Sequence, residues 1–448
     1  MAAASRSRRS GKRRDADSGP AAPVSHSVTL RRLPWWALGL SVVVLLSAAF
    51  AADPLRDAAT FQSVPEVHLV LSAGYVLLAP VCDVFDTLSL MSVPQHIAIV
   101  VSLLVLFAGW RAWRARRRPT ALLRETGAAA LALVGVVALY AAAVLVPRPM
   151  AALAVQTPLN DVVLVADFHS HTTYSHDGAP WFSPEANRRW HADAGYDVAY
   201  VTDHRTVRGA AEGIAANPAE AGQGTMLLQG LEVVWDGAHV NILGAERGYR
   251  GLTDPNLRDV DDTALTLASM LRGHEPIVIF TFPGLLRHLH AAQAPGTPGA
   301  RAIEIVDGSP RGLTDTRRKR TVIATIADTF NLALVSGTDN HGWGYTAPAW
   351  TLVQLPGWRG MGTDSLAASI DEVIRTRGFT GTEVIERRQA NTAGSPLRLA
   401  ATLPLVAARM FTMLSDNERV SWLIWIWALV LIRFAWRRRR SRPGAAAA

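Results

Sequence analysis

Four apolar runs, each close to the length needed to cross a bilayer, constrain this chain more than any other feature. They cover residues 33–52, 93–110, 127–146 and 420–436, and the first and third contain no charged side chain. A membrane-spanning helix needs about 20 predominantly apolar residues. The sequence therefore predicts four transmembrane helices, and only the long segment between the third and the fourth is left to form a soluble unit.

Two further apolar runs are weaker. Residues 67–85 include Pro80 and Asp83, and residues 397–414 include two Arg residues and a Pro. Polar and helix-breaking residues within such short runs disfavour a full crossing. We interpret the first run as re-entrant or interfacial and the second as an amphipathic helix on the membrane surface.

Arginine-rich clusters next to the four runs decide the orientation. They lie in residues 1–33, 111–118 and 433–442, and short loops rich in Lys and Arg stay on the cytoplasmic side. Four spans put all three clusters inside, whereas a fifth span at 67–85 would put two of them outside. The sequence predicts an integral protein of the bacterial inner-membrane type, with cytoplasmic termini and an extracytoplasmic, periplasmic central segment.

Two other topologies stay open. The small residues at 49–51 resemble a signal-peptide cleavage site, and cleavage there would leave the central segment outside. The competing placement puts the central segment in the cytoplasm.

The sequence predicts six segments along the chain. They are a basic tail at 1–32, a membrane region at 33–150, a soluble domain at 155–390, an amphipathic helix at 397–414, a last span at 420–436 and a basic tail at 437–448.

The net charge of +8 comes from these membrane-flanking clusters, and the rest of the chain is acidic. An acidic extracytoplasmic domain is a poor partner for nucleic acid, so we expect none. The single Cys82 excludes a disulfide framework and a thiolate metal cluster.

The soluble segment alternates short apolar runs with helix-compatible stretches, a pattern typical of an α/β barrel. Enrichment in β-branched residues suggests buried parallel strands. The expected strands are residues 161–168, 197–203, 225–234, 239–244, 276–282, 301–306 and 331–337.

Histidines and carboxylates gather at the ends of these expected strands, where barrel active sites lie. His169 and His171 are two residues apart, so in an extended segment they share a face, and imidazole suits Zn, Mn or Fe. Taken singly, Glu232 would be a surface acid and His239 a core histidine. Asp203 lies beside His204 at one strand end, and together the residues predict a metal centre with these ligands: His169, His171, His176, Asp177, His204, Glu232, His239, Asp339 and His341.

The ordered set DFHSHTTYSHDG, TDH, GLE followed by His, and SGTDNH resembles the polymerase and histidinol phosphatase (PHP) superfamily over residues 161–345. The resemblance implies a distorted (β/α)7 barrel with up to three divalent metals that hydrolyse phosphate esters. It implies one metal on His169, His171 and Asp339, with Glu232 bridging to a second metal that His239 also holds. A third metal would take His204, His341 and either His176 or Asp177.

One position departs from the family pattern. A further His usually precedes a Pro at the end of a middle strand, and here Phe282 precedes Pro283. Phenylalanine cannot bind a metal, so the second site is weakened. His274 and His288 are close in sequence and are the available substitutes.

We therefore expect a metal-dependent phosphoesterase in which activated water attacks phosphorus, and His204 or His341 protonates the leaving group if it is not a metal ligand. Its substrate would be a phosphorylated small molecule or a lipid-linked phosphate. The alternatives are a catalytically impaired module that binds a metal or phosphorylated ligand as a membrane sensor, and hydrolysis of an amide or lactone. The basic run Arg317–Arg320 either attracts an anionic substrate or, as we favour, forms a solvated helix face.

Overall fold

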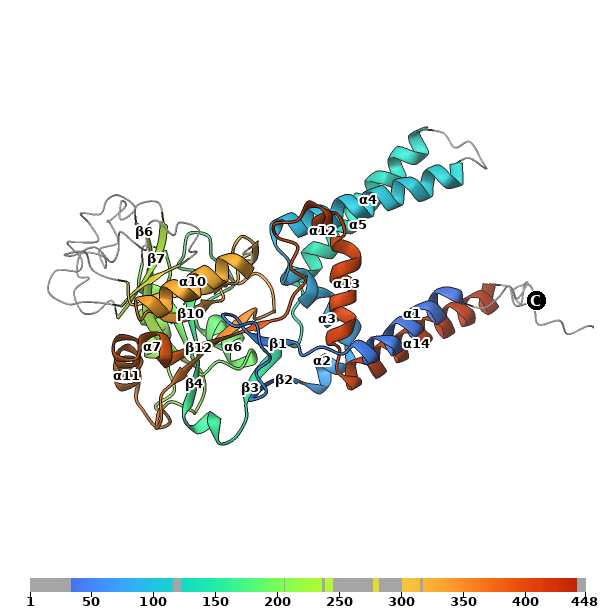
Figure 1. The fold of residues 1–448 in the computed structure, drawn as a ribbon. Helices are drawn as coiled ribbons and strands as arrows, with labels where there is room; N and C mark the ends of the chain where they lie inside the picture. The colour runs from blue at the N-terminus through green and yellow to red at the C-terminus, as the bar shows by residue number, and fades with distance from the viewer. Residues whose placement is uncertain are drawn as a thin grey trace, which may run out of the picture.

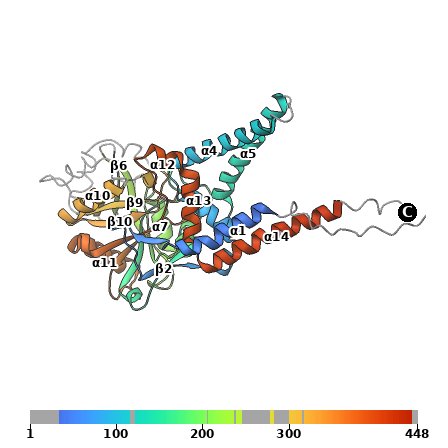
Figure 2. The ribbon, with the colours of Figure 1, turned by 45° about the vertical axis from the view of Figure 1, so that its right-hand side comes forward.

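The computed structural model describes residues 34–115, 122–204, 206–235, 238–244, 277–281, 300–314 and 317–440. The chain folds into an α/β unit from which two pairs of helices project on the same side (Figure 1). A view turned by 45° shows the same arrangement (Figure 2).

The α/β unit is built on one ten-stranded sheet with the order β1-β12-β11-β4-β5-β6-β7-β8-β9-β10. All seven expected strands are present: β4 (Val163–Ser170), β5 (Val198–Val201), β6 (Met226–Trp235), β7 (Ala238–Leu243), β8 (Ile277–Phe280), β9 (Ala302–Asp307) and β10 (Ala333–Gly337). Three more strands extend the sheet beyond β4: β11 (Ala349–Gln354), β12 (Thr382–Arg387) and β1 (Leu55–Asp57).

The expectation of parallel strands throughout is wrong. Strands β4, β5 and β6 are parallel, as are β8, β9 and β10, but β7 is antiparallel to both of its neighbours. Only residues 236–237 separate β6 from β7, whereas a parallel crossover needs a dozen residues or more.

The sheet curls until β10 approaches β4. The Asp339 backbone N–H donates to the carbonyl of His169 at 2.9 Å, and the His171 N–H donates to the carbonyl of Asn340 at 3.0 Å. Among the described residues, no strand ladder joins β10 to β4. The fold is a mixed α/β structure with a curled sheet, and the ends of β4 and β10 meet beside each other.

Helices pack against the sheet, and its central strands are buried on both faces. The helices are α6 (Pro184–Asp193), α7 (Arg208–Ala215), α10 (Arg317–Thr329) and α11 (Thr363–Thr376). Every residue of β4 is buried, and Phe168 on that strand stacks on Tyr200 of β5 with ring centroids 5.1 Å apart. Burial on both faces explains why these strands are nearly continuous apolar runs.

The basic run at the start of α10 is only partly a solvated face. Arg320 is 3% exposed and forms an ion pair with Glu386 of β12. The guanidinium of Arg317 lies 4.6 Å from the centre of the Phe61 ring. These two side chains connect α10 to β12 and to the Phe61 ring.

Three described helices are long and apolar enough to cross a membrane: α4 (Val93–Ala115), α5 (Leu122–Leu145) and α14 (Asp416–Arg440). Helix α1 (Trp35–Ser47), with the 3-10 turn that continues it to Phe50, is apolar but shorter. Helix α4 packs against α5, and α1 packs against α14, in the two projecting helix pairs (Figure 1).

The two weaker apolar runs form several short elements. Residues 67–85 contain β2 (Val67–Leu71), α2 (Ala73–Leu77) and part of α3 (Ala79–Ser89), and β2 pairs with β3 (Ala151–Val155). Residues 397–414 contain most of α12 (Pro396–Ala400) and all of α13 (Thr402–Met413). One face of α13 buries Thr402, Val406 and Met410, as an amphipathic helix does. Because β1 pairs with β12, part of the predicted membrane region belongs to the sheet.

Candidate metal centre

Four side chains from three strand ends converge on one point, and we call them the inner group: His169, His171, Glu232 and Asp339. The Nε2 atom of His169 lies 3.1 Å from Nε2 of His171 and 3.1 Å from Oε2 of Glu232. The Nε2 atom of His171 lies 3.1 Å from the same Glu232 oxygen and 3.2 Å from Oδ1 of Asp339. Two nitrogens and two carboxylate oxygens therefore face one another.

These separations fit a shared cation. Donor atoms about 2.0–2.2 Å from a transition-metal ion are about 3.0–3.5 Å from one another in tetrahedral or octahedral geometry. His169, His171 and Glu232 are at most 3% exposed. Buried charge of this kind requires a partner, and a mixed set of imidazoles and carboxylates suits Zn, Mn or Fe.

A second cluster, the outer group, consists of Asp177, His204 and His341. Oδ2 of Asp177 lies 3.1 Å from Nε2 of His341 and 3.5 Å from Nε2 of His204. That His341 nitrogen is buried. The His341 ring stacks on His171 with centroids 3.9 Å apart, so the outer group adjoins the inner one.

His176 and Asp177 were the two alternatives for this cluster. The side chain of His176 is 70% exposed, and its Nδ1 lies 3.9 Å from Asp177. Its ring centroid is 5.0 Å from that of His204. Asp177 contacts both histidines of the outer group, so its geometry is the better match for a shared ligand.

Glu232 lies between the two groups. Its Oε2 contacts the inner histidines and is also 3.5 Å from Nδ1 of His204. Its Oε1 accepts a hydrogen bond from Nδ1 of His239, whose side chain is 49% exposed. Glu232 thus has the position that a carboxylate bridging two ions would need.

Buried carboxylates hold the loops that carry these residues. Asp167 accepts hydrogen bonds from the backbone N–H and the hydroxyl of Thr338, at 3.0 and 2.6 Å, and lies 2.8 Å from Nε2 of His191. Asp203 accepts two from Thr172, at 2.6 and 2.7 Å. Neither carboxylate is exposed, so the ends of β4, β5 and β10 are tied together beneath the site.

Glu304 on β9 is a residue that the sequence analysis missed. Its Oε2 lies 3.3 Å from Nδ1 of His169, and it is 1% exposed. A carboxylate on the far ring nitrogen is the usual support of a metal-bound histidine. The space is so tight that a Cβ on Gly337 would lie 1.9 Å from Glu304 Oε1. A charged residue inside the apolar strand AIEIVD was the available signal.

Neighbouring groups within the site shift the pKa values of His171 and Asp177. Burial opposes the protonated form of His171, but hydrogen bonds with Asp339 and Glu232 raise its pKa to about 9. Burial likewise opposes ionisation of Asp177, yet hydrogen bonds from His204 and His341 lower its pKa below the usual range. Protons on the histidines therefore stabilise the metal-free centre, and a metal must displace them.

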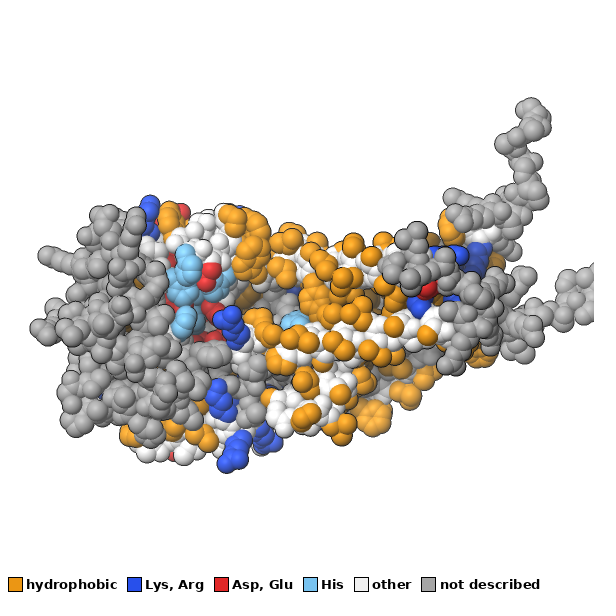
Figure 3. All heavy atoms as spheres, turned by 90° about the horizontal axis from the view of Figure 1, so that it is seen from above, with side chains coloured by type: hydrophobic (Ala, Val, Ile, Leu, Met, Phe, Trp, Pro, Cys, Tyr) orange, Lys and Arg blue, Asp and Glu red, His pale blue; other side chains and the backbone are white. Residues whose placement is uncertain are grey.

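The position that departs from the family pattern lies outside the described residues, as do Pro283, His274 and His288. Strand β8 ends at Phe280, and Thr281 follows it. From above, a patch of histidine side chains with some carboxylates is visible on the surface of the α/β unit, next to the apolar side chains of the helical part (Figure 3).

No family model matches this sequence. No curated protein matches it either. Among solved structures, PsfC from Pseudomonas syringae matches with a TM-score of 0.36 and 17% identity, over 55% of this chain and 98% of that one. A candidate metal-dependent phosphoesterase from Bifidobacterium adolescentis matches with a TM-score of 0.30 and 17% identity, over 48% and 96%.

Endonuclease Q, in complex with a 27-mer duplex substrate, matches with a TM-score of 0.34 and 10% identity, over 47% of this chain and 57% of that one. This finding corrects the expectation that nucleic acid is not a partner. The physical flaw was to argue from the net charge of the domain, because bound cations dominate the charge that a phosphate meets at such a site.

Proposed function

We propose that this protein is a membrane-anchored, metal-dependent hydrolase of the PHP type that cleaves a phosphoester. The observation that carries the proposal is Glu232, whose carboxylate contacts His169 and His171 on one side and His204 and His239 on the other. A carboxylate between two sets of imidazoles is placed to bridge two adjacent metal ions.

Each group has a distinct role in the proposal. The inner group, supported by Glu304, would hold one divalent ion, and Glu232 and His239 would be ligands of a second. Asp177, His204 and His341 would hold a third. When bound, such ions lower the pKa of water toward about 7 and stabilise charge on phosphoryl oxygens.

The chain's own residues then orient the ester and manage its proton. The oxygen of water forms a bond to phosphorus, the ester P–O bond breaks, and the leaving alcohol takes up a proton. His204 or His341 donates that proton if it does not hold an ion, and their side chains are 12% and 17% exposed. Asp177 keeps their rings oriented.

The arrangement of the helices supports the predicted anchoring. The start of α1, the end of α14, the end of α4 and the start of α5 all lie at the end remote from the α/β unit (Figures 1 and 2). Arg111, Arg114 and Arg437 lie on helices near that end. We propose that this end is cytoplasmic and that the α/β unit lies outside, because basic flanks stay inside.

A module that binds metal or phosphate without turnover is the second candidate, favoured by the half-exposed His239 at the weakest of the three sites. Assay of the full-length protein in detergent separates the two. Metal content would be counted with Mn or Zn, and a chromogenic phosphomonoester and phosphodiester would be offered. We expect turnover that His169→Ala abolishes and that His68→Ala, at an exposed histidine on β2, preserves. Stoichiometric metal without turnover would refute the hydrolase.

A further inference from the structure

One cavity joins the metal centre to two of the candidate membrane helices. Its volume is about 730 Å³, and its lining includes Asp177, Asp339 and His341 at one end and Val93, Ile97 and Val144 at the other. The first three belong to the inner and outer groups, and the last three belong to α4 and α5. Sites for small ligands are typically about 300–1,000 Å³.

The two ends of this cavity offer different chemistry. The metal-centre end presents carboxylates and imidazoles to an anionic ester. The helix end presents aliphatic side chains, and Ile97 is 60% exposed although it is a large apolar residue. Covering such an aliphatic side chain with an alkyl chain is favourable, because the contact removes apolar surface from water.

Polar and aromatic side chains mark the boundary between these ends. His96 Nδ1 lies 3.1 Å from the hydroxyl of Tyr140, and both residues line the cavity. Trp343, two residues after His341, lines it as well. Such amphipathic rings are enriched at the level of lipid headgroups.

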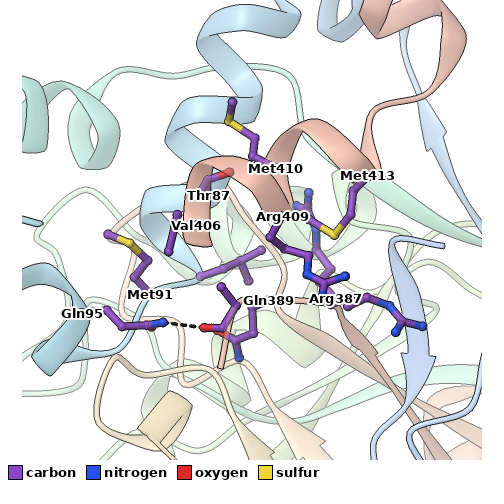
Figure 4. Close-up of a pocket in the computed structure, with 12 residues that line it drawn as sticks. Thr87, Met91, Gln95, Arg387, Gln389, Val406, Arg409, Met410 and Met413 are labelled. Atoms are coloured by element: carbon purple, nitrogen blue, oxygen red, sulfur yellow. Dashed lines mark hydrogen bonds between the residues drawn. The ribbon is translucent and has the colours of Figure 1, made fainter. Parts of the chain in front are cut away.

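Fixed contacts hold the helix end against the metal end. The Val93 backbone N–H donates to the carbonyl of Pro310 at 3.2 Å. Arg148, just after α5, donates to the hydroxyl of Thr346 at 2.8 Å. On the other side of α4, Gln95 donates to the carbonyl of Ala390 beside a small pocket (Figure 4). The two ends of the cavity therefore belong to one preformed site.

We infer that the substrate is an amphiphile, a phosphoester with a long alkyl chain drawn from the membrane, whose phosphate lies at the metal centre and whose chain lies against α4 and α5. This inference rests on the proposed function and names its substrate class. Both helices are long and apolar enough to span a bilayer, and the cavity lies where they leave the α/β unit. A lipid that moves from the bilayer into this cavity keeps its alkyl chain against the apolar side chains of α4 and α5.

Binding is tested first, without turnover. A single-chain alkyl phosphate with a photoreactive diazirine at the end of its chain is added to the full-length protein in detergent micelles, and the labelled peptides are mapped. We expect adducts near residues 93–97 and 140–144, reduced by Ile97→Trp, which fills the groove. Leu106→Trp is the matched control, because Leu106 lies on the same helix, is 61% exposed and does not line the cavity.

Turnover tests the same groove. Methyl and octyl 4-nitrophenyl phosphates differ only in the alkyl chain, and hydrolysis of either releases 4-nitrophenolate and the alkyl phosphate. Each buried methylene increases affinity about fourfold, so we expect kcat/KM for the octyl ester to exceed that of the methyl ester by at least tenfold. Ile97→Trp should bring this ratio toward one, and Leu106→Trp should leave it unchanged.

Three results would overturn the inference. They are equal labelling of the two Trp variants, equal kcat/KM for the two esters, and cleavage of a DNA duplex in preference to the octyl ester. Absence of turnover for both esters would instead refute the proposed function, while the labelling experiment would still decide whether the groove binds an alkyl chain.

Discussion

The inner and outer groups use the same types of side chain but are held in different ways. In the inner group, His169, His171 and Glu232 are at most 3% exposed and Asp339 is 18% exposed, and Asp167 and Glu304 contact His169. Asp177, His204 and His341 lie on loops, with side chains 43%, 12% and 17% exposed. From this comparison we propose that the inner group is organised for a tightly held ion and the outer group for an ion or proton that exchanges.

Removing an inner ligand should have the largest effect. His169→Ala leaves Glu232, Glu304 and Asp339 without the imidazole that they surround. We expect loss of the tightly held metal and a fall in activity greater than the ~100-fold that changes to supporting residues cause. Metal counting and phosphodiester turnover would measure both, with His68→Ala as control. Retention of stoichiometric metal by His169→Ala would break the distinction between the groups.

The support from Glu304 gives the next largest effect. Glu304→Gln keeps the shape but weakens the hold on Nδ1 of His169, so metal affinity should fall about 10- to 100-fold. Titration with a fluorescent chelator as competitor would measure it. Glu185→Gln, at a surface carboxylate on α6, is the control, and equal affinities in the two variants would show that Glu304 does not orient the ligand.

The outer group should be more tolerant. Asp177→Asn removes the carboxylate that His204 and His341 share, and we expect activity to fall about tenfold, the low end for a supporting change, while the inner metal stays bound. His176→Ala, at the exposed neighbour, should remain close to the wild type. A larger loss from His176→Ala than from Asp177→Asn would reverse the assignment that geometry favours.

Proton release should accompany metal binding. With its pKa raised to about 9, His171 carries a proton at pH 7 in the metal-free protein. The metal needs the neutral ring, so affinity should rise about tenfold per pH unit for each displaced proton and level off above pH 9. Calorimetry in buffers of different ionisation enthalpy would measure the released protons. A pH-independent affinity between pH 6 and 8 would contradict a histidine-rich inner group.

The candidate site was largely predictable because its signal is local. The pairs His169–His171 and Asp339–His341 each lie at one strand end, so a two-residue spacing places the members of a pair together. Convergence of different strand ends follows from the general geometry of barrels. Glu304 escaped because a single acid in a strand carries no spacing signal, although its burial in AIEIVD required a partner.

The fold was less predictable where pairing is long-range. Strand β1 pairs with β12 across more than 300 residues, and no local pattern marks Leu55–Asp57 as a strand of that sheet. The antiparallel β7 could have been found, because an Asp-Gly pair between two apolar runs is a hairpin signal in the sequence. The 397–414 run breaks at Ala401 between α12 and α13, and both helices pack against α4.

Direct location of the metal tests the central claim most sharply. Crystals of the full-length protein grown with Mn or Zn would be measured at the absorption edge of that metal. The account predicts an anomalous peak about 2.0–2.2 Å from Nε2 of His169 and Nε2 of His171, with Glu232 and Asp339 completing its ligands. A fully occupied metal elsewhere, with these four side chains bound only to one another, would contradict it.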